Sequence, residues 1–188
     1  MPMRNNVFLV AGLVFLFMCG QDGRMGGKSP SSEKKKIEWL SWNEMIKVKK
    51  KSKKKIFIDV YTTWCGWCRY MDANVFTHPD VVETINKYYI PVKLDAEMKD
   101  TIYFDNHVFV NPAPGIPRST HQLAYALLDG RTAYPSFVIL DSQLRRLQIL
   151  QGAMAPEKLI DILLYFGTDS FQKMTFDEFL KNRKGGNR

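Results

Sequence analysis

Two cysteines that stand three residues apart, directly after a strongly apolar run, are the feature that most constrains this chain. Residues 56–61 are β-prone and almost continuously apolar, which predicts a central strand buried on both faces. Cys65 and Cys68 follow at once, and we expect a helix from this pair through Ala73. A disulfide this short closes almost no loop and adds little stability. The value of the pair is therefore chemical.

The main alternative for this pair is half of a zinc site. A structural zinc ion needs about four ligands. The remaining candidates are Cys19, His78, His107 and His121, and their spacing is not that of ligands. We therefore expect no metal and no cofactor, and we expect the histidines to be surface groups or hydrogen-bonded core groups.

The position of the pair at the start of a helix favours redox chemistry. Free backbone N–H groups and the positive end of the helix dipole stabilise a thiolate at Cys65. Cys68 lies one turn further into the helix and is expected to be more shielded. That arrangement suits an attacking thiol at Cys65 and a resolving thiol at Cys68.

The first nineteen residues are typical of an export signal. Arg4 supplies a positive start, and the apolar run from Val7 to Met18 is too short to span a bilayer. The run ends at Cys19 and resembles the lipobox of bacterial lipoproteins, in which that cysteine is lipid-modified. Met18 departs from the small residue usual there. Simple cleavage near residues 20–23 and an uncleaved anchor remain open, and each alternative places the protein outside the cytoplasm, in the periplasm or on a membrane.

The positive charge of the chain is concentrated in one segment. Residues 24–55 hold twelve lysines and arginines against three glutamates, a net charge of +9, while the rest of the chain carries −1 and the whole chain +8. Residues 20–37 form a basic polar tether that either stays solvated or lies against anionic lipid headgroups. We expect no nucleic-acid binding, because no basic surface with interleaved aromatic residues occurs elsewhere.

The order of predicted elements indicates an α/β sandwich around a mixed sheet. A capping box of Ser41 and Glu44 opens the first helix. The further elements that we expect are a helix at 79–88, a strand at 90–94, a hairpin of 102–104 and 108–110, a helix at 119–128, strands at 136–140 and 147–150, a helix at 156–166 and a terminal helix from 176.

The segment Phe57-Ile58-Asp59-Val60-Tyr61-Thr62-Thr63-Trp64-Cys65-Gly66-Trp67-Cys68 resembles the signature of the thioredoxin superfamily. In type it resembles the exported thioredoxin-like proteins of bacterial envelopes. The resemblance covers residues 38–167 and implies the thioredoxin fold. Residues 98–133 depart from the minimal fold as an insertion before Pro135, and we expect a C-terminal helix and tail at 168–188.

The resemblance also implies roles for single residues. Asp59 matches a buried carboxylate beneath the resolving cysteine, and Lys93 matches a lysine beside that carboxylate. Pro135 matches a cis-proline opposite the redox pair. The substrate-binding surface then comprises Trp64, Gly66, Trp67, Tyr134 and Pro135.

These expectations lead to a thiol–disulfide oxidoreductase of the cell envelope. Its partners would be proteins with disulfides or dithiols and a membrane redox partner. Gly66-Trp67 differs from the pairs usual in reducing thioredoxins and in isomerases, so the direction of electron flow stays open. The alternative is a redox-inactive thioredoxin-like binding or chaperone module, and the insertion favours it.

Overall fold

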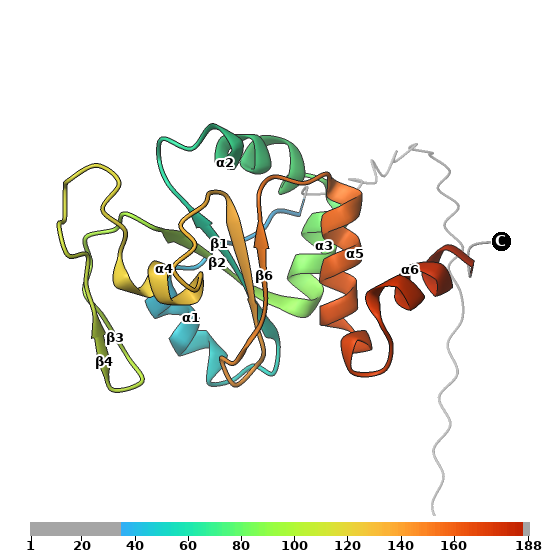
Figure 1. Ribbon diagram of the computed structural model, residues 1–188. Helices are drawn as coiled ribbons and strands as arrows, with labels where there is room; N and C mark the ends of the chain where they lie inside the picture. The colour runs from blue at the N-terminus through green and yellow to red at the C-terminus, as the bar shows by residue number, and fades with distance from the viewer. Residues whose placement is uncertain (1–34, 186–188) are drawn as a thin grey trace, which may run out of the picture. The chain divides into compact units, whose positions relative to one another are not determined.

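The computed structural model describes residues 35–185 (Figure 1). The expected signal peptide with Cys19 and most of the tether lie outside this range. The helices are α1 (Trp42–Lys49), α2 (Gly66–Tyr70), α3 (Pro79–Tyr88), α4 (Gln122–Leu127), α5 (Pro156–Gly167) and α6 (Phe176–Gly185), with a π-helical turn η1 (Met71–Val75) and a 3-10 turn η2 (Ser170–Gln172). The strands are β1 (Lys55–Tyr61), β2 (Tyr89–Asp95), β3 (Ile102–Phe104), β4 (His107–Phe109), β5 (Ser136–Leu140) and β6 (Arg146–Gln151).

Four strands form one mixed sheet in the order β2-β1-β5-β6. Strand β2 runs parallel to β1, β5 runs antiparallel to β1, and β6 runs antiparallel to β5. Strand β1 therefore has a neighbour on each side and helices over both faces, which explains why its apolar run is nearly continuous. The predicted mixed sheet between helices, a thioredoxin fold, is confirmed.

Two hydrophobic cores lie on opposite faces of this sheet. Helices α1 and α4 cover one face, and α3 and α5 cover the other (Figure 1). Ile56 and Ile58 point into the first core, and Phe57 points into the second, because side chains alternate along a strand. Complete burial of each contributes roughly 1.5–3 kcal/mol. The same alternation places Asp59 and its register partner Lys93 on the face of Phe57, on which α2 also lies.

The helix that begins at the cysteine pair was expected to be continuous through Ala73, and the structure differs. The α-helical part ends at Tyr70 and is followed by the π-helical turn η1. In this turn the N–H of Phe76 donates to the carbonyl of Met71 at 2.9 Å. The wider turn lets Met71, Val75 and Phe76 all enter the core, where each is at most 5% exposed.

The insertion forms a small hairpin, followed by a loop held by hydrogen bonds and by helix α4. Strands β3 and β4 are joined by Asp105 and Asn106, both with positive φ, as a two-residue hairpin turn requires. Helix α4 was expected from residue 119 but begins at Gln122. The reason is that the chain is still extended at His121, whose N–H donates to the carbonyl of Ala96 at 2.7 Å.

His121 is fully buried and holds two segments of the insertion together. Its Nδ1 accepts the N–H of Leu123 at 3.1 Å, and its Nε2 lies 2.9 Å from the carbonyl oxygen of Asp100. We expect His121→Ala to lower the free energy of unfolding by about 2–3 kcal/mol, because the change opens a cavity and removes both partners. Urea unfolding measures this effect. His107→Ala, at an exposed site, serves as the control and should change stability by less than about 0.5 kcal/mol.

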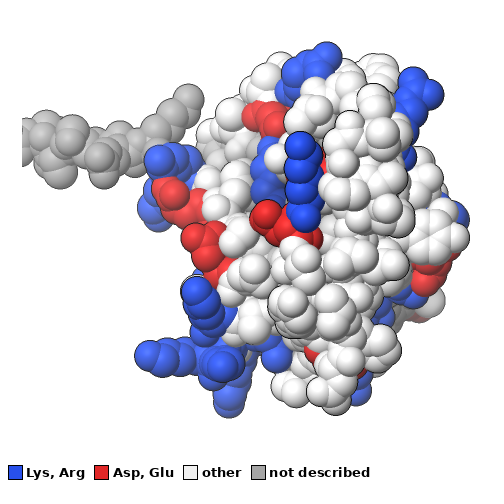
Figure 2. Space-filling view, turned by 90° about the vertical axis from the view of Figure 1, so that its left-hand side faces the viewer, with Lys and Arg blue, Asp and Glu red and all other residues white. Residues whose placement is uncertain are grey.

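The face that carries the insertion shows its charges in separate groups. Figure 2 is turned toward this side and shows basic and acidic side chains among broad uncharged areas. Lysine and arginine side chains also gather at the lower left of this view. Among residues 35–185, every helix is too short or too polar to cross a bilayer.

Candidate functional site

Cys65 and Cys68 are joined in a disulfide at the start of α2. Cys65 is the N-cap of this helix, and its Sγ accepts the N–H of Cys68 at 3.0 Å. The residues are 5% and 3% exposed, so Cys68 is more shielded only by a small margin. An N–H aimed at Sγ favours the charged form of a thiol, and Cys65 is therefore the better placed attacking group.

The turn before the pair is held by backbone and side-chain hydrogen bonds. The N–H of Cys65 donates to the carbonyl of Thr62 at 3.2 Å, directly after β1 ends. Arg69 Nη1 reaches back to the carbonyl of Thr63 at 3.0 Å. Steric crowding does not require a glycine at position 66, because a Cβ there would have only Arg69 Nη2 nearby, at 3.9 Å.

Lys93 lies between two carboxylates on the face of the sheet that α2 covers. Its Nζ is 3.5 Å from Asp59 Oδ2 and also contacts Asp72 Oδ1. Asp59 is buried, and its Oδ1 has no hydrogen-bond partner among the described residues. The side chain of Asp72 is 42% exposed. Lys93 therefore shares its charge between a buried and a half-exposed carboxylate.

Burial raises the pKa of Asp59 to about 7, although the nearby Lys93 ammonium acts in the opposite direction. The negative charge of Asp72 adds to the rise. A carboxyl group with a pKa near neutrality exchanges its proton readily at physiological pH. The sequence indicated a buried carboxylate at Asp59 but gave no sign of Asp72, which comes from the π-helical turn.

Removing the charge of Asp72 should lower the pKa of Asp59. In Asp72→Asn, Asp59 loses a repelling neighbour, and Lys93 retains it as the only carboxylate partner among the described residues. Titration of the Asp59 carboxyl carbon by NMR measures the change. Asp80→Asn, an exposed change in the first turn of α3, is the control. An unchanged or raised pKa in Asp72→Asn would contradict this electrostatic account.

Aromatic side chains surround the redox pair. The Trp64 ring packs edge-on against Tyr134 with the centroids 6.0 Å apart, and the Tyr134–Pro135 peptide bond is cis. Trp67 is 64% exposed and packs against Tyr70 at 5.7 Å. The residue before Cys65 therefore touches the residue before Pro135.

The insertion also reaches this surface. A hollow of about 370 Å³ lies beside the aromatic pair and is lined by Trp64, Glu97, Arg118, Thr120, Thr132 and Tyr134. Sequence reasoning named only two of these six residues. The others follow β2 or belong to the insertion, and no motif marks them.

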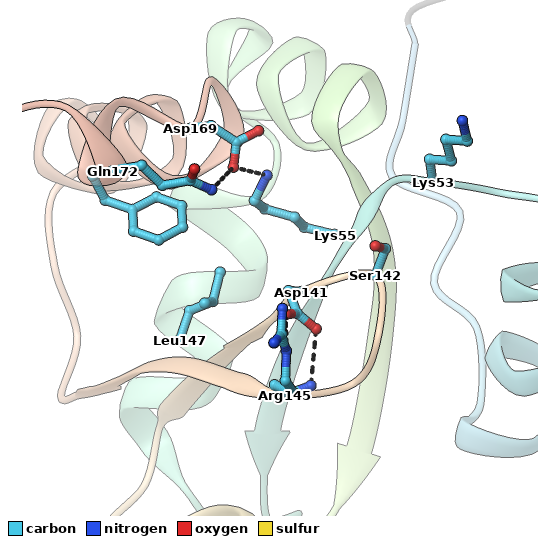
Figure 3. A pocket seen from close by; sticks show the side chains of 9 residues that line it. Lys53, Lys55, Asp141, Ser142, Arg145, Leu147, Asp169 and Gln172 are labelled. Atoms are coloured by element: carbon cyan, nitrogen blue, oxygen red, sulfur yellow. Dashed lines mark hydrogen bonds and ion pairs between the residues drawn. The ribbon is translucent and has the colours of Figure 1, made fainter.

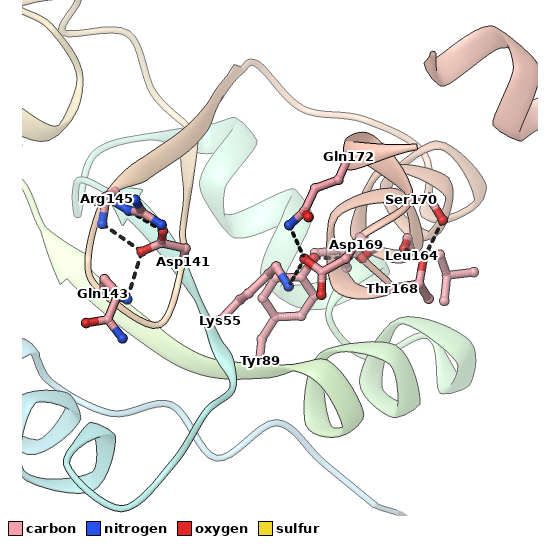
Figure 4. Close-up of polar contacts among 11 residues, drawn as sticks. Lys55, Tyr89, Asp141, Gln143, Arg145, Leu164, Thr168, Asp169, Ser170 and Gln172 are labelled. Carbon is pink, nitrogen blue, oxygen red and sulfur yellow. Dashed lines mark hydrogen bonds and ion pairs between the residues drawn. The ribbon is translucent and has the colours of Figure 1, made fainter. Parts of the chain in front are cut away.

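A second hollow, of about 380 Å³, lies where β1 begins and the β5–β6 turn and η2 meet (Figure 3). Its cations are largely paired. Lys55 Nζ is 2.8 Å from Asp169 Oδ1, and Arg145 Nε is 2.7 Å from Asp141 Oδ2. Close by, Thr168 Oγ1 donates to a carbonyl of α5 (Figure 4). We interpret this region as a structural junction that ties the C-terminal segment to the sheet.

The side chains of the histidines contact helix starts and a turn. The side chain of His78 caps α3, and that of His121 caps α4. The ring of His107 lies 2.6 Å from the carbonyl oxygen of Asp105. Residues 35–185 contain no group of three or more His, Cys, Asp or Glu side chains placed to hold a metal ion.

Comparison with known families identifies the chain. The family model Thioredox_DsbH, described as a protein of unknown function, DUF255, matches residues 30–143. This match spans more than half of the 188 residues. The chain belongs to the Thioredox_DsbH family. It is thus a member of the thioredoxin superfamily, and its Cys65–Cys68 pair indicates a general redox role for this Thioredox_DsbH protein.

Individual relatives are more distant. An uncharacterised protein from Archaeoglobus fulgidus is 33% identical over 63 residues, which are 34% of this chain and 50% of that protein. The chain thus matches about half the length of this curated relative. Three solved structures resemble the Thioredox_DsbH chain: a candidate disulphide-isomerase from Bacteroides thetaiotaomicron (23% identity, TM-score 0.51, covering 74% of this chain and 98% of that one), a thioredoxin-fold protein from Helicobacter pylori (14%, 0.51, 81% and 85%) and a thioredoxin from Thermus thermophilus (13%, 0.50, 68% and 84%). These likenesses show the fold.

Proposed function

We propose that this protein is a thiol–disulfide oxidoreductase that acts on protein disulfides in the bacterial cell envelope. The observation that carries the proposal is the Cys65–Cys68 pair at the start of α2, where Cys65 Sγ accepts a backbone N–H and Trp64 packs on Tyr134. The pair thus adjoins an aromatic surface on which a polypeptide can lie.

The reaction begins with the reduced pair. The Cys65 thiolate attacks one sulfur of a substrate disulfide, which forms a mixed disulfide and expels the other substrate sulfur as a thiolate. Cys68 then loses its proton and attacks Cys65 Sγ. This step restores the Cys65–Cys68 disulfide and releases the substrate as a dithiol, so two electrons pass from the protein to the substrate. The reverse sequence oxidises a substrate dithiol.

Asp59 and Lys93 support the second step in this proposal. Asp59, with its pKa near 7, accepts the Cys68 proton directly or through water. Lys93 limits how far burial raises that pKa. Trp64, Gly66, Trp67, Tyr134 and Pro135 form the surface against which the substrate lies.

The proposed location rests on the first nineteen residues and their resemblance to a lipoprotein signal. In the envelope, sustained reduction requires electrons from a membrane partner, and sustained oxidation requires an acceptor. Cys19 is the candidate site for a lipid anchor. Incorporation of a labelled fatty acid into the wild type, and its loss in Cys19→Ser, would support the anchor.

Reduction of insulin by dithiothreitol tests the proposed activity. We expect the wild type to accelerate precipitation of the insulin B chain, and the double variant Cys65→Ser/Cys68→Ser to give only the uncatalysed rate. A wild type no faster than the double variant, on insulin and on other disulfide proteins, would contradict the proposal.

A binding or chaperone module is the second candidate. It is favoured by the exposed aromatic side chains around the pair, since Trp64 and Trp67 are at least half exposed. Complementation of a deletion strain separates the two candidates. If the double serine variant restores the phenotype fully, redox chemistry is dispensable and the binding function holds.

A further inference from the structure

The hollow between the redox pair and the insertion has fixed walls. Trp64 Nε1 donates to Glu97 Oε1 at 3.1 Å, and the edge of Trp64 meets Tyr134. On the insertion side, Thr120 Oγ1 lies 3.4 Å from the Tyr134 hydroxyl. The hollow is therefore lined by Trp64, which precedes Cys65, by Tyr134, which precedes Pro135, and by the loop of the insertion.

The insertion places Arg118 at this hollow through a tight turn. The N–H of Ser119 donates to the carbonyl of Ile116 at 3.1 Å, and Pro117 is the first central residue of this turn. Arg118 is the second central residue and has a φ of 66°. Glycine or asparagine is usual at such a position, because a left-handed conformation is unfavourable for a long side chain. The turn thus keeps an arginine where its own geometry does not favour one.

A buried asparagine locks the turn in place. Asn111 Nδ2 donates to the carbonyl of Ser119 at 2.9 Å and lies 3.3 Å from the carbonyls of Glu97 and Met98. Its Oδ1 accepts the N–H of Ala113 at 3.1 Å. Because Asn111 binds both the loop and the segment after β2, the backbone that carries Arg118 is held in place before any substrate arrives.

The Arg118 guanidinium has a free hydrogen-bonding edge. Its Cζ lies 5.5 Å from the centre of the Trp64 ring, a distance at which the cation is attracted by the aromatic face. It forms no ion pair with any residue among 35–185, and Trp64 Nε1 donates to one oxygen of the Glu97 carboxylate in the same hollow. A guanidinium that is stacked and otherwise unpaired is suited to binding a carboxylate with two parallel hydrogen bonds.

We propose that Arg118 binds a carboxylate of the substrate, so that the protein prefers extended segments with an aspartate or glutamate close to the reacting cysteine. The proposal rests on the oxidoreductase function for its meaning, but the binding itself does not require turnover. The insertion thereby becomes the element that selects the substrate.

Two sets of labelled octapeptides test this preference. The central residue is serine in one set and cysteine in the other. Within each set, glutamate is placed at one flanking position at a time, and matched peptides carry glutamine or lysine at that position. Fluorescence anisotropy with the serine peptides and the oxidised wild type measures affinity without chemistry. We expect at least one glutamate peptide to bind about 3- to 10-fold more tightly than its glutamine counterpart, with the difference reduced at 0.5 M salt by about half or more.

Variants of the chain decide whether Arg118 is responsible. Arg118→Gln should remove the preference and Arg118→Glu should reverse it toward lysine, whereas Arg131→Gln, outside the hollow, should keep it. Equal affinities for all peptides, a preference for lysine in the wild type, or a preference retained in Arg118→Gln would overturn the inference.

The cysteine peptides distinguish this inference from the proposed function. They are presented to the reduced protein as mixed disulfides with 2-mercaptoethanol, which is neutral. Glutamate-dependent affinity without thiol exchange would uphold the carboxylate site and contradict the oxidoreductase. Thiol exchange at equal rates for all peptides, with equal affinities, would support the oxidoreductase and contradict the carboxylate site.

Discussion

Replacing Cys68 with serine is expected to stop turnover and to trap the protein on its substrates. Without the resolving thiol, the mixed disulfide at Cys65 persists, because the hydroxyl of serine does not attack a disulfide. We expect insulin reduction by Cys68→Ser to fall on the order of 100-fold or more. Non-reducing gels of cells that express the variant should show covalent complexes that disappear on reduction.

The matched control is Cys65→Ser, which retains Cys68 but lacks the proposed attacking thiol. Both variants are best made in a Cys19→Ser background, so that any complex must arise from the redox pair. Complexes formed by Cys65→Ser and not by Cys68→Ser would show that the two roles are exchanged. Full turnover by Cys68→Ser would contradict the mechanism.

Replacing Asp59 with asparagine is expected to stabilise the oxidised protein at neutral and alkaline pH. The ordinary pKa of this carboxyl group is 3.8, and burial raises it to about 7 in the fold. Between these values the folded state retains a proton that the unfolded state has lost. The contribution of Asp59 to the free energy of unfolding therefore falls as pH rises through this window and is greatest below about pH 4.

Asparagine cannot ionise, so the variant avoids this loss. The interval from 3.8 to about 7 corresponds to about 4 kcal/mol at about 1.4 kcal/mol per pKa unit. The pKa of about 7 already includes the attraction between Lys93 and Asp59. Relaxation around a buried charge reduces the full effect, so we expect the variant to be about 2–4 kcal/mol more stable than the wild type at pH 8. Urea unfolding at several pH values measures the difference.

Asp105→Asn, a change in an exposed turn, is the control for a general effect of charge and should leave the pH dependence intact. If the unfolding free energies of Asp59→Asn and the wild type stay parallel from pH 4 to pH 8, the raised pKa of Asp59 is contradicted.

Local patterns in the sequence were sufficient to predict the centre of the fold. The apolar run of β1 and the cysteines after it are local patterns, whereas the roles of Asp59, Lys93 and Pro135 came from the resemblance to the thioredoxin superfamily. Strand alternation then places Asp59 and Lys93 on the same face, since both lie on adjacent strands in register. The ion pair between them follows from that register.

The residues that the sequence did not reveal depend on contacts between distant segments. Asp72 meets Lys93 only because the chain after Tyr70 widens into a π-helical turn, and no residue in this stretch marks that change. Arg118 reaches Trp64 only because buried Asn111 and His121 fix the insertion. Polar residues in a long insertion predict only a loop. That Asn111 and His121 are buried, and can therefore fix the insertion, becomes visible only in the folded chain.

The reduction potential of the Cys65–Cys68 couple tests the central claim most directly. The oxidised protein is equilibrated with graded ratios of reduced and oxidised dithiothreitol or glutathione, and the fraction of dithiol is measured by thiol alkylation. The proposed function predicts one two-electron transition with a midpoint between about −270 and −120 mV, the range of catalytic couples. A disulfide that resists reduction until below about −300 mV, as structural disulfides do, would contradict it.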